Sequence, residues 1–170
     1  MKRIVVIGSG GAGKSTLARA MGERLGLPVV HLDAQFWQAG WKGRDREDWL
    51  EWQRRALLEP RWIMDGNYGG TLDVRLSAAD TVIFLDLPPA ICVARALGRA
   101  LRYWGRTRPD MAAGCPERLD LKFLSWIWQY PRKNRPAVLE KLLKLECKTV
   151  VRLQSVGAVQ RFTDQLTRWS

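Results

Sequence analysis

Short, nearly continuous apolar runs alternate along the chain with stretches whose apolar residues recur every three or four positions. The run TVIFLDL at 81–87 is apolar enough to be buried on both faces, as strands of parallel sheets are. After the first such run, Leu17, Met21 and Leu25 recur at the spacing of an amphipathic helix. The pattern predicts strands at 2–8, 28–32, 61–65, 81–87 and 148–153. It predicts helices at 14–25, 45–58, 71–76, 89–104, 116–130, 136–146 and 156–169, with irregular segments at 33–44 and 105–115.

Strands that alternate with helices predict a parallel sheet with right-handed crossovers and helices on both faces. With 170 residues and no internal repeat or linker-like segment, the chain is expected to form one domain, 1–170. Ligands of such sheets bind beyond the carboxyl ends of the strands. A glycine-rich segment, Asp33, Asp65 and Asp86 all follow predicted strands, so we expect them to converge at one edge.

The segment IGSGGAGKST at 7–16 follows the first predicted strand and matches two phosphate-binding patterns. Its glycines match the G-x-G-x-x-G of dinucleotide-binding domains, and Asp33 lies 20 residues beyond the last of them, where an acid would bind a ribose. With Lys14 and Ser15 the segment also matches the P-loop, G-x-x-x-x-G-K-[ST]. Both patterns bring backbone amides to a phosphate at a helix N-terminus, where the helix dipole favours an anion.

Lys14 and Ser15 decide between the two patterns. A dinucleotide site has no use for a lysine here, whereas in a P-loop the ammonium reaches the β- and γ-phosphates and the next hydroxyl binds Mg²⁺. The predicted strand before the segment and the amphipathic helix after it supply the expected context. We therefore expect an α/β, three-layer P-loop NTPase fold that binds ATP and Mg²⁺. The predicted ATP-binding residues are Gly8, Gly10, Gly11, Ala12, Gly13, Lys14, Ser15 and Thr16.

The chain is strongly basic, with 28 basic and 17 acidic residues and a formal net charge of +11. Ten of the basic residues but three of the acidic ones lie within 95–135. This local excess favours a polyanionic partner, either nucleotide phosphates or nucleic acid. Arg95, Arg99 and Arg102 share one face of a predicted helix, and Arg106 and Arg108 follow in a loop. Because arginines stabilise a phosphoryl group in transfer, we expect this segment to close over the phosphates.

Three cysteines, far apart and in no C-x-x-C pattern, suggest a reduced, cytoplasmic protein rather than a disulfide framework or a zinc site. No apolar stretch approaches the roughly 18 residues that span a bilayer, so no membrane partner is expected. We expect a monomer or a weak dimer. His31 is the only histidine, and we expect it to be a satisfied residue at a strand end rather than a catalytic one.

Several further stretches resemble the adenylate kinase-like P-loop kinases and, among them, the bacterial proteins called DNA topology modulation or FlaR-like proteins. These stretches are HLDAQFWQAGW at 31–41, RWIMDGNYGGTLDVRL at 61–76, VIFLDLP at 82–88 and GRTRPDMAAGCPERLDLKFLSWIWQYPR at 105–132. The resemblance implies a five-stranded sheet in the order 2-3-1-4-5. It implies an acceptor-binding region at about 33–60 and a basic lid at about 99–135. It also implies that Asp65 lies with Ser15 at the Mg²⁺ site.

The acceptor side departs from adenylate kinases, which carry D-G-F-P-R where this chain has DGNYG at 65–69. The arginine that contacts the monophosphate in those kinases is therefore missing, and Arg75 could replace it. The region after the second predicted strand is instead rich in aromatic residues, which could form a wall for a base or a sugar. The candidate acceptor-binding residues are Asp33, Trp37, Trp41, Asn67 and Arg75.

Asp33 is expected to orient or deprotonate the acceptor, although it could instead cap the next turn. Together with Lys14, Arg99 and Arg106 it makes up the predicted catalytic set, and Arg102 is added to the ATP site. The expected function is transfer of the ATP γ-phosphoryl group to a small acceptor, with a nucleoside monophosphate or related nucleotide foremost. Two alternatives stay open. One is a kinase for a non-nucleotide small molecule; the other is a nucleic-acid-binding regulator of DNA topology, which is not favoured because no nucleic-acid-binding motif is visible.

Overall fold

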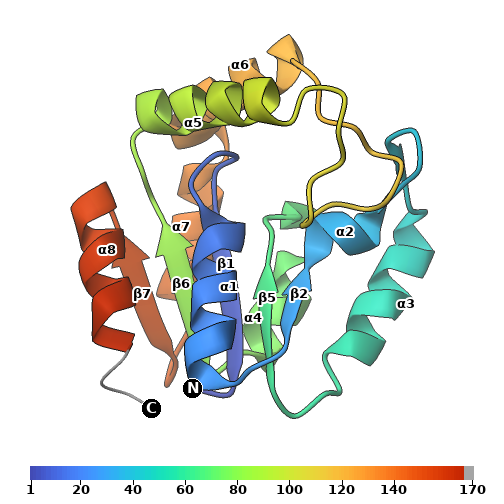
Figure 1. Ribbon diagram of the computed structural model, residues 1–170. Helices are drawn as coiled ribbons and strands as arrows, with labels where there is room; N and C mark the ends of the chain where they lie inside the picture. Colours follow the sequence, from blue (N-terminus) through green and yellow to red (C-terminus); the bar gives the residue numbers. More distant parts are fainter. Residues whose placement is uncertain (167–170) are drawn as a thin grey trace.

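The computed structural model describes residues 1–166, and a five-stranded parallel sheet forms its centre (Figure 1). Across the sheet the strands lie in the order β2 (Val29–His31), β5 (Trp62–Asp65), β1 (Arg3–Gly8), β6 (Thr81–Leu85) and β7 (Thr149–Leu153). Each strand is parallel to its neighbours. Numbered by their place in the chain, these strands follow the order 2-3-1-4-5, so the predicted α/β fold and strand order are confirmed.

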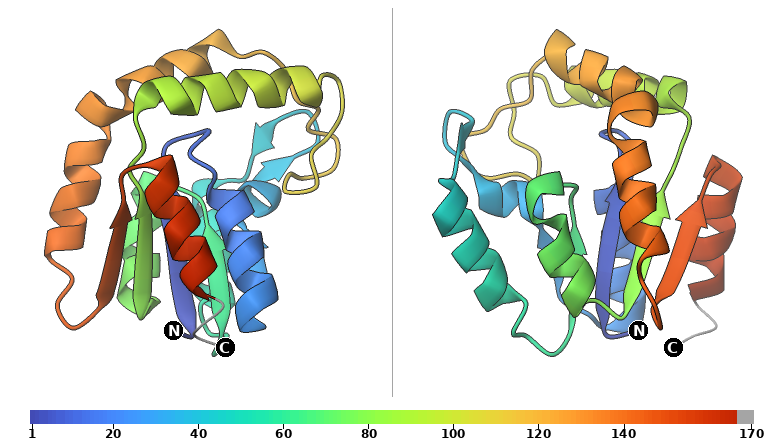
Figure 2. Two further views of the ribbon diagram at one scale, coloured as in Figure 1. Left: turned by 60° about the vertical axis from the view of Figure 1, so that its left-hand side comes forward. Right: turned by 180° about the vertical axis from the view of Figure 1, so that it is seen from behind.

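The longer helices are α1 (Lys14–Leu25), α3 (Arg46–Ala56), α4 (Leu72–Ala78), α5 (Pro89–Arg102), α6 (Leu121–Lys133), α7 (Arg135–Leu143) and α8 (Val156–Gln165). Helices α1 and α8 pack on one face of the sheet, and α4 and α7 pack on the other (Figure 2). Helices α5 and α6 pass above the carboxyl ends of the strands (Figure 1). Within residues 1–166 no helix is both long enough and apolar enough to cross a membrane.

Strand β1 shows how the sheet is buried on both faces. Ile4 and Val6 belong to a core with α1 and α8, whereas Val5 and Ile7 belong to a second core with α4 and α7. All four residues are completely buried. This double burial explains why the strands are continuous apolar runs in the sequence rather than alternating ones.

The segment after β2 differs from the irregular structure expected at 33–44. It forms a short helix, α2 (Leu32–Phe36), followed by an antiparallel hairpin of β3 (Trp37–Gln38) and β4 (Lys42–Gly43). These elements contain two to five residues each, which is too short for helical or alternating periodicity to be recognised in a sequence.

The region above the sheet also differs from the expectation. The helix expected at 116–130 begins only at Leu121, because the Asp120 carboxylate caps it by accepting a hydrogen bond from the Phe123 amide at 3.0 Å. Residues 103–120 instead form an irregular segment, which we call the lid loop. Helix α6 continues through Pro131, where a break is expected, and ends at Lys133. The last expected helical turn, 167–169, lies outside the described residues.

Helix α3 offers a direct test of a local signal, since the Asp45 carboxylate accepts a hydrogen bond from the Glu47 amide at 2.8 Å. Asp45→Ala should lower the free energy of unfolding by about 1 kcal/mol, because a helix-end amide loses its partner. Asp45→Asn keeps an oxygen at the same place and should remain close to wild type. Chemical denaturation followed by tryptophan fluorescence measures both variants, and an equal loss in the two would contradict the capping role.

Candidate active site

The glycine-rich loop joins the end of β1 to the start of α1 and passes beneath α5 (Figure 1). Gly11 and Gly13 have φ values of 72° and 96°, in the left-handed region that side chains disfavour. A Cβ atom on Gly11 would lie 2.1 Å from the carbonyl oxygen of Cys92, so the loop approaches α5 too closely for a side chain at this position. The Lys14 ammonium donates to the Ser9 carbonyl at 2.9 Å. The loop therefore has the close-packed shape of a phosphate cradle.

Lys14 lies among charged groups from several parts of the fold. Burial lowers the pKa of Lys14, the charges of Asp33 and Asp65 oppose this effect, and the charge of Arg99 adds to it. A buried ammonium has lost the water that would solvate its charge, so it gains from an anion placed beside it. Lys14 would therefore be stabilised by negatively charged phosphate oxygens. The charges of Asp33 and Arg99 are close enough to act on it.

Asp65 ends β5 beside the loop and is only 3% exposed. Its carboxylate accepts a hydrogen bond from the Ser15 hydroxyl at 2.7 Å and lies 2.5 Å from Nδ1 of His31. The hydrogen bond with Asp65 raises the pKa of His31. His31 is therefore a satisfied strand-end residue, as predicted, and it helps to hold the carboxylate next to Ser15.

Ser15 and Asp65 present oxygen atoms that suit magnesium. Within residues 1–166 no three or more histidine, cysteine, aspartate or glutamate side chains are grouped so that they could hold a metal ion. Mg²⁺ keeps several waters and takes its other ligands from substrate phosphates and one or two protein oxygens, of the kind that Ser15 and Asp65 carry. The donor set is therefore consistent with a cation that arrives with a nucleotide.

A cavity of about 1070 Å³ lies over the loop and extends to the hairpin, the lid loop and α8. Small-molecule sites have volumes of about 300–1,000 Å³, so there is room for a nucleotide together with a small second substrate. Seven basic and four acidic side chains line the cavity, which favours an anionic ligand. The predicted site residues that line it are Gly10, Gly11, Ala12, Gly13, Lys14, Ser15, Thr16, Asp33, Trp37, Trp41, Asn67, Arg99 and Arg102.

Comparison with known proteins shows which solved structures share this fold. No protein-family model and no curated protein sequence matches the chain. Among solved structures, shikimate kinase from Bacteroides thetaiotaomicron aligns with 99% of this chain and 97% of its own, at a TM-score of 0.59 and 18% identity. The chain has the fold of this kinase.

Two further structures agree. Shikimate kinase from Acinetobacter baumannii, solved in complex with shikimate, aligns with 99% of this chain and 92% of its own, at a TM-score of 0.59 and 14% identity. A gluconokinase from Sinorhizobium meliloti 1021 aligns with 99% of this chain and 97% of its own, at a TM-score of 0.52 and 17% identity. The similarity supports the P-loop kinase fold, while membership of the DNA topology modulation subgroup stays a prediction.

Arg75, which the sequence places at the acceptor, is completely buried and does not line the cavity. Its guanidinium donates to the carbonyls of Gly66, Asn67 and Tyr68 at 2.8, 2.6 and 3.1 Å. Burial lowers the pKa of Arg75 to about 10. This placement does not support the expected contact with the acceptor, which stays a prediction. Arg75 supports the loop after β5, and it shapes the wall of the cavity without touching its contents.

The sequence places both Arg106 and Arg108 in the lid loop and assigns the catalytic role to Arg106. Arg106, predicted to be catalytic, is exposed and does not line the cavity. Arg108 and Arg118 line the cavity instead, and the side chain of Arg108 is only 9% exposed. In an irregular loop no periodicity indicates which of two nearby arginines points inward, so the sequence could identify the segment but not the residue.

Two other residues that follow strands also have structural roles. A Cβ atom on Gly8 would lie 2.5 Å from the carbonyl oxygen of Leu85, so this glycine permits close packing of neighbouring strands and does not line the cavity. Asp86 forms ion pairs with Arg135 at 2.9 Å and with Arg152 at 2.6 Å. The carboxyl edge of the sheet thus brings residues together, but only some of them reach the ligand space.

Asp33 lines the cavity and accepts a hydrogen bond from the Tyr68 hydroxyl at 2.7 Å. Burial raises the pKa of Tyr68, and the charge of Asp33 raises it further, so the phenol stays protonated and donates. Tyr68 has a φ of 35°, an unusual conformation for a residue other than glycine. The alternative role of Asp33 as a cap is not seen, because α2 begins without a side-chain capping bond. Local sequence carries no signal for a bond between residues this far apart.

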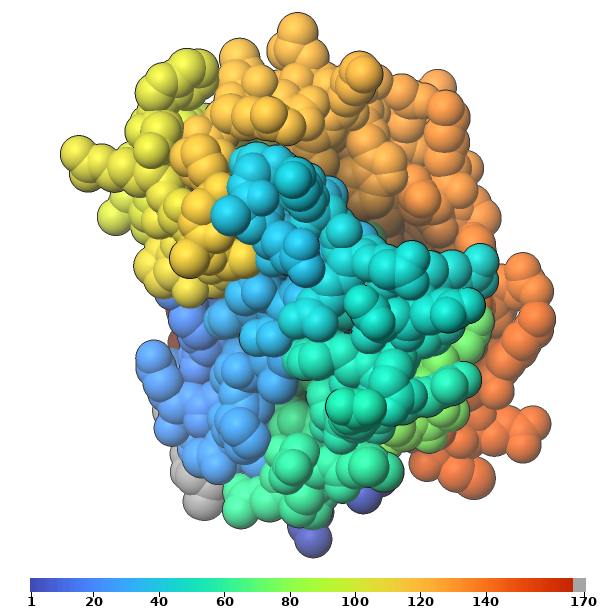
Figure 3. Space-filling view, turned by 90° about the vertical axis from the view of Figure 1, so that its right-hand side faces the viewer, coloured from blue at the N-terminus to red at the C-terminus, as the bar shows by residue number. Residues whose placement is uncertain are grey.

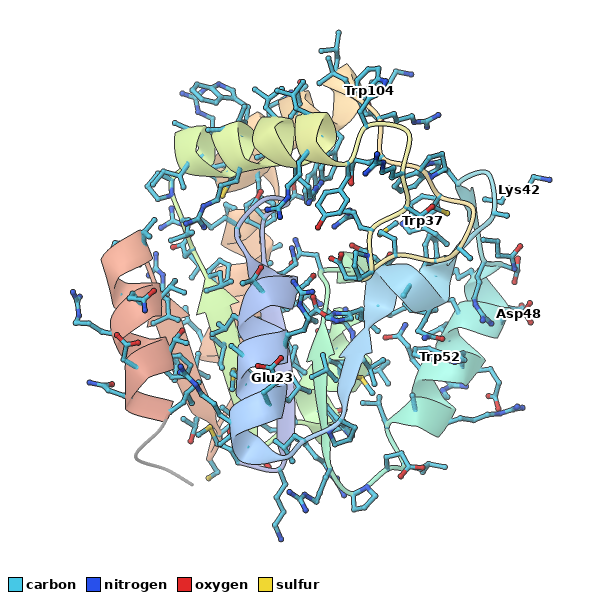
Figure 4. All side chains as sticks on the ribbon, in the orientation of Figure 1. Glu23, Trp37, Lys42, Asp48, Trp52 and Trp104 are labelled. Atoms are coloured by element: carbon cyan, nitrogen blue, oxygen red, sulfur yellow. The ribbon has the colours of Figure 1, made fainter. Side chains whose placement is uncertain are left out.

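An aromatic cluster lies beside Asp33, with ring centres 4.9–5.5 Å apart. Its members are Phe36, Trp37, Trp41, Trp49 and Tyr68. In the view of Figure 4, Trp37 lies within the outline of the lid loop, whereas Trp104 lies at the top of the molecule and is exposed. Trp37 and Trp41 line the cavity, while Trp49 is buried in the fold, so only part of the cluster is available to a ligand.

The bond between Tyr68 and Asp33 predicts a defined kinetic effect in an acceptor-dependent assay. Tyr68→Phe should lower kcat about ten- to a hundredfold, because Asp33 would no longer be held in one orientation. The KM for Mg-ATP should stay within twofold, since the phosphate cradle is unchanged. Ser77→Ala, which removes an exposed hydroxyl on α4 that bonds the Val74 carbonyl and does not line the cavity, is the control and should leave kcat near wild type. A wild-type kcat for Tyr68→Phe would contradict the positioning of Asp33.

Proposed function

We propose that the protein is a P-loop kinase that transfers the γ-phosphoryl group of ATP to a hydroxyl group of a small acceptor. The observation that carries this proposal is the arrangement of one cavity. The phosphate cradle with Lys14 and the Asp33 carboxylate held by Tyr68 line the same space. Phosphate binding by itself needs no carboxylate, whereas a carboxylate beside the acceptor can serve as the base that takes its proton.

Mg-ATP, when bound, would supply a phosphoryl group whose negative charge is partly neutralised by the metal. Lys14 and the loop amides would bind its phosphate oxygens, and Ser15 with Asp65 would hold the cation. Asp33 would accept the proton of the attacking hydroxyl, while Arg99 offsets charge on the phosphoryl group. Helix α5 and the lid loop would keep bulk water away, so catalysis rests on positioning and electrostatics.

Asp33 also bears on the class of acceptor. An alcohol loses a proton as it attacks, so a carboxylate beside it assists the reaction. The attacking oxygen of a nucleoside monophosphate is already negatively charged, and a carboxylate would repel it. The burial of Arg75 removes the cation expected to bind a monophosphate. Both observations favour a hydroxyl group, and two kinases that share the fold are named for shikimate.

A nucleoside or nucleotide acceptor, the class that the sequence places first, has one observation in its favour. Trp37 and Trp41 line the cavity, and the Arg118 guanidinium lies 5.8 Å from the centre of the Trp41 ring. Aromatic faces beside a cation suit a planar base. A nucleoside would combine such a base with the hydroxyl group that Asp33 requires.

The positions of the basic residues favour the kinase over the nucleic-acid-binding alternative. Arg99 and Arg108 form ion pairs with Glu117 inside the lid, and Arg135 pairs with Asp86. Much of the positive charge that suggested a polyanion is therefore directed at the cavity or neutralised within the fold.

The proposal is tested by measuring ADP release from Mg-ATP in the presence of hydroxy acids, polyols, nucleosides and nucleoside monophosphates. We expect one hydroxyl-bearing class to raise turnover well above the background rate. Lys14→Ala should reduce kcat/KM at least a hundredfold, because the phosphate oxygens lose their buried cation. Intact ATP binding without turnover by any acceptor class would overturn the proposal.

Asp33→Asn tests the role of the proton acceptor without changing the phosphate cradle. The amide cannot accept the proton, so kcat with the best acceptor should fall by about 10²–10⁴. The KM for Mg-ATP should remain within threefold of wild type. If a nucleoside monophosphate were the true acceptor, removal of the negative charge would leave kcat unchanged or raise it, and the assignment of a hydroxyl acceptor would be wrong.

A further inference from the structure

Glu117 is a nearly buried carboxylate in the lid loop, with 7% of its surface exposed. Its backbone is fixed on both sides, since its amide donates to the Arg106 carbonyl at 2.9 Å and its carbonyl accepts from the Gly105 amide at 3.1 Å. These bonds tie the end of the lid loop to its beginning. The side chain of Glu117 therefore starts from a well-defined position beneath the lid.

Glu117 is shared by two arginines. Its Oε2 atom lies 2.5 Å from Nε of Arg108 and 3.4 Å from Nε of Arg99. Arg99 belongs to α5 and Arg108 to the lid loop, so one carboxylate oxygen joins two separate elements.

Without an anion between them, the two guanidinium groups would repel each other. Burial lowers the pKa of Arg99, the nearby charge of Arg108 lowers it further, and Glu117 opposes both effects. Repulsion between like charges is strong where water is largely excluded. Glu117 therefore accounts for the close approach of two cations in a partly buried place.

The two arginines lie on the same cavity as the phosphate cradle. The charge of Arg99 lowers the pKa of Lys14, and the charge of Asp33 in turn acts on Arg99. Arg99 is thus close to both the cation expected at the phosphates and the carboxylate expected at the acceptor. This is the region in which a phosphoryl group would pass from donor to acceptor.

Glu117 also lies next to the place where the lid loop meets the hairpin of 37–43. The indole of Trp41 donates to the carbonyl of Pro116 at 3.1 Å, and the Gly40 amide donates to the carbonyl of Gly114 at 2.8 Å. The space-filling view shows these two segments in contact at the rim of the molecule (Figure 3). The arginine pair is therefore anchored to the acceptor side of the cavity as well as to α5.

We infer that Glu117 is a positioning residue, which holds Arg99 and Arg108 together as a clamp for the phosphoryl group in transfer. The inference rests on the proposed kinase function. A single arginine could neutralise one phosphate oxygen, whereas a pair held by one carboxylate presents two cations at a fixed separation. Such an arrangement favours the transferring group, which spreads its charge over several oxygens, over the ground state of bound nucleotide.

The test compares the affinity of the full chain for Mg-ADP with its affinity for Mg-ADP plus aluminium fluoride, a planar mimic of the transferring phosphoryl group. Calorimetry measures both without any turnover. Glu117→Gln should leave the Kd for Mg-ADP within threefold, which also shows that the variant is folded. It should weaken the aluminium fluoride complex at least tenfold. Glu51→Gln, which removes an exposed carboxylate paired with Arg55 on α3, should change neither value.

The outcomes separate the inference from the proposed function. If the wild-type protein gains no affinity from aluminium fluoride, the kinase function itself is wrong. If aluminium fluoride raises the affinity of wild type and Glu117→Gln equally, the kinase function stands and the role of Glu117 is refuted. A second experiment introduces Glu117→Gln into a protein that already carries Arg99→Gln and Arg108→Gln. In that background Glu117→Gln should change the Kd of the aluminium fluoride complex less than twofold, because the arginines through which Glu117 acts are gone. A further tenfold loss in that background would mean that Glu117 does not act through the arginines.

Discussion

The Asp65 carboxylate is the group on which the rest of the site depends. Asp65 is the last residue of β5, and its carboxylate accepts a hydrogen bond from the Ser15 hydroxyl at the start of α1. The same carboxylate contacts His31 at the end of β2. Three segments far apart in the sequence are thereby joined at the carboxyl edge of the sheet. An unpaired charge as buried as this one would be strongly unfavourable, so these contacts are a condition of the fold as much as of the site.

The cost of leaving charges unpaired also explains how charges are distributed around the cavity. Seven cations can line one space only if anions and carbonyl groups are interleaved with them. Glu117 and Asp110 neutralise Arg108, and the carbonyls at 66–68 accept hydrogen bonds from the terminal nitrogens of Arg75. Lys14 bonds a carbonyl and has only more distant charges around it, which leaves the cation of the P-loop in need of an anion. The Lys14 cation thus lies where phosphate would bind.

Backbone strain is concentrated at the acceptor side. Three non-glycine residues within 1–166 have positive φ, and two of them, Trp41 and Tyr68, line the cavity. Tyr68 is held by Arg75 beneath it and by the hydrogen bond to Asp33, and Trp41 is held by its bond to Pro116 in the lid loop. Strained conformations persist only where surrounding contacts impose them, and they are common at functional sites. The hairpin and the lid loop therefore form one preorganised wall.

The sequence by itself determined the strands of a parallel sheet and the phosphate loop, because these depend on apolar runs and glycine spacing. Its resemblance to the adenylate kinase-like proteins, rather than any local pattern, implied the strand order and the pairing of Ser15 with Asp65. In the lid the sequence assigned the catalytic role to Arg106, whereas the structure has Arg108 lining the cavity. On the acceptor side it chose Arg75, which the structure buries beneath the cavity wall. Tyr68 holding Asp33, and Glu117 joining two arginines, depend on contacts between distant segments. Only the tertiary structure decided them, because irregular loops carry no periodicity that fixes the direction of a side chain.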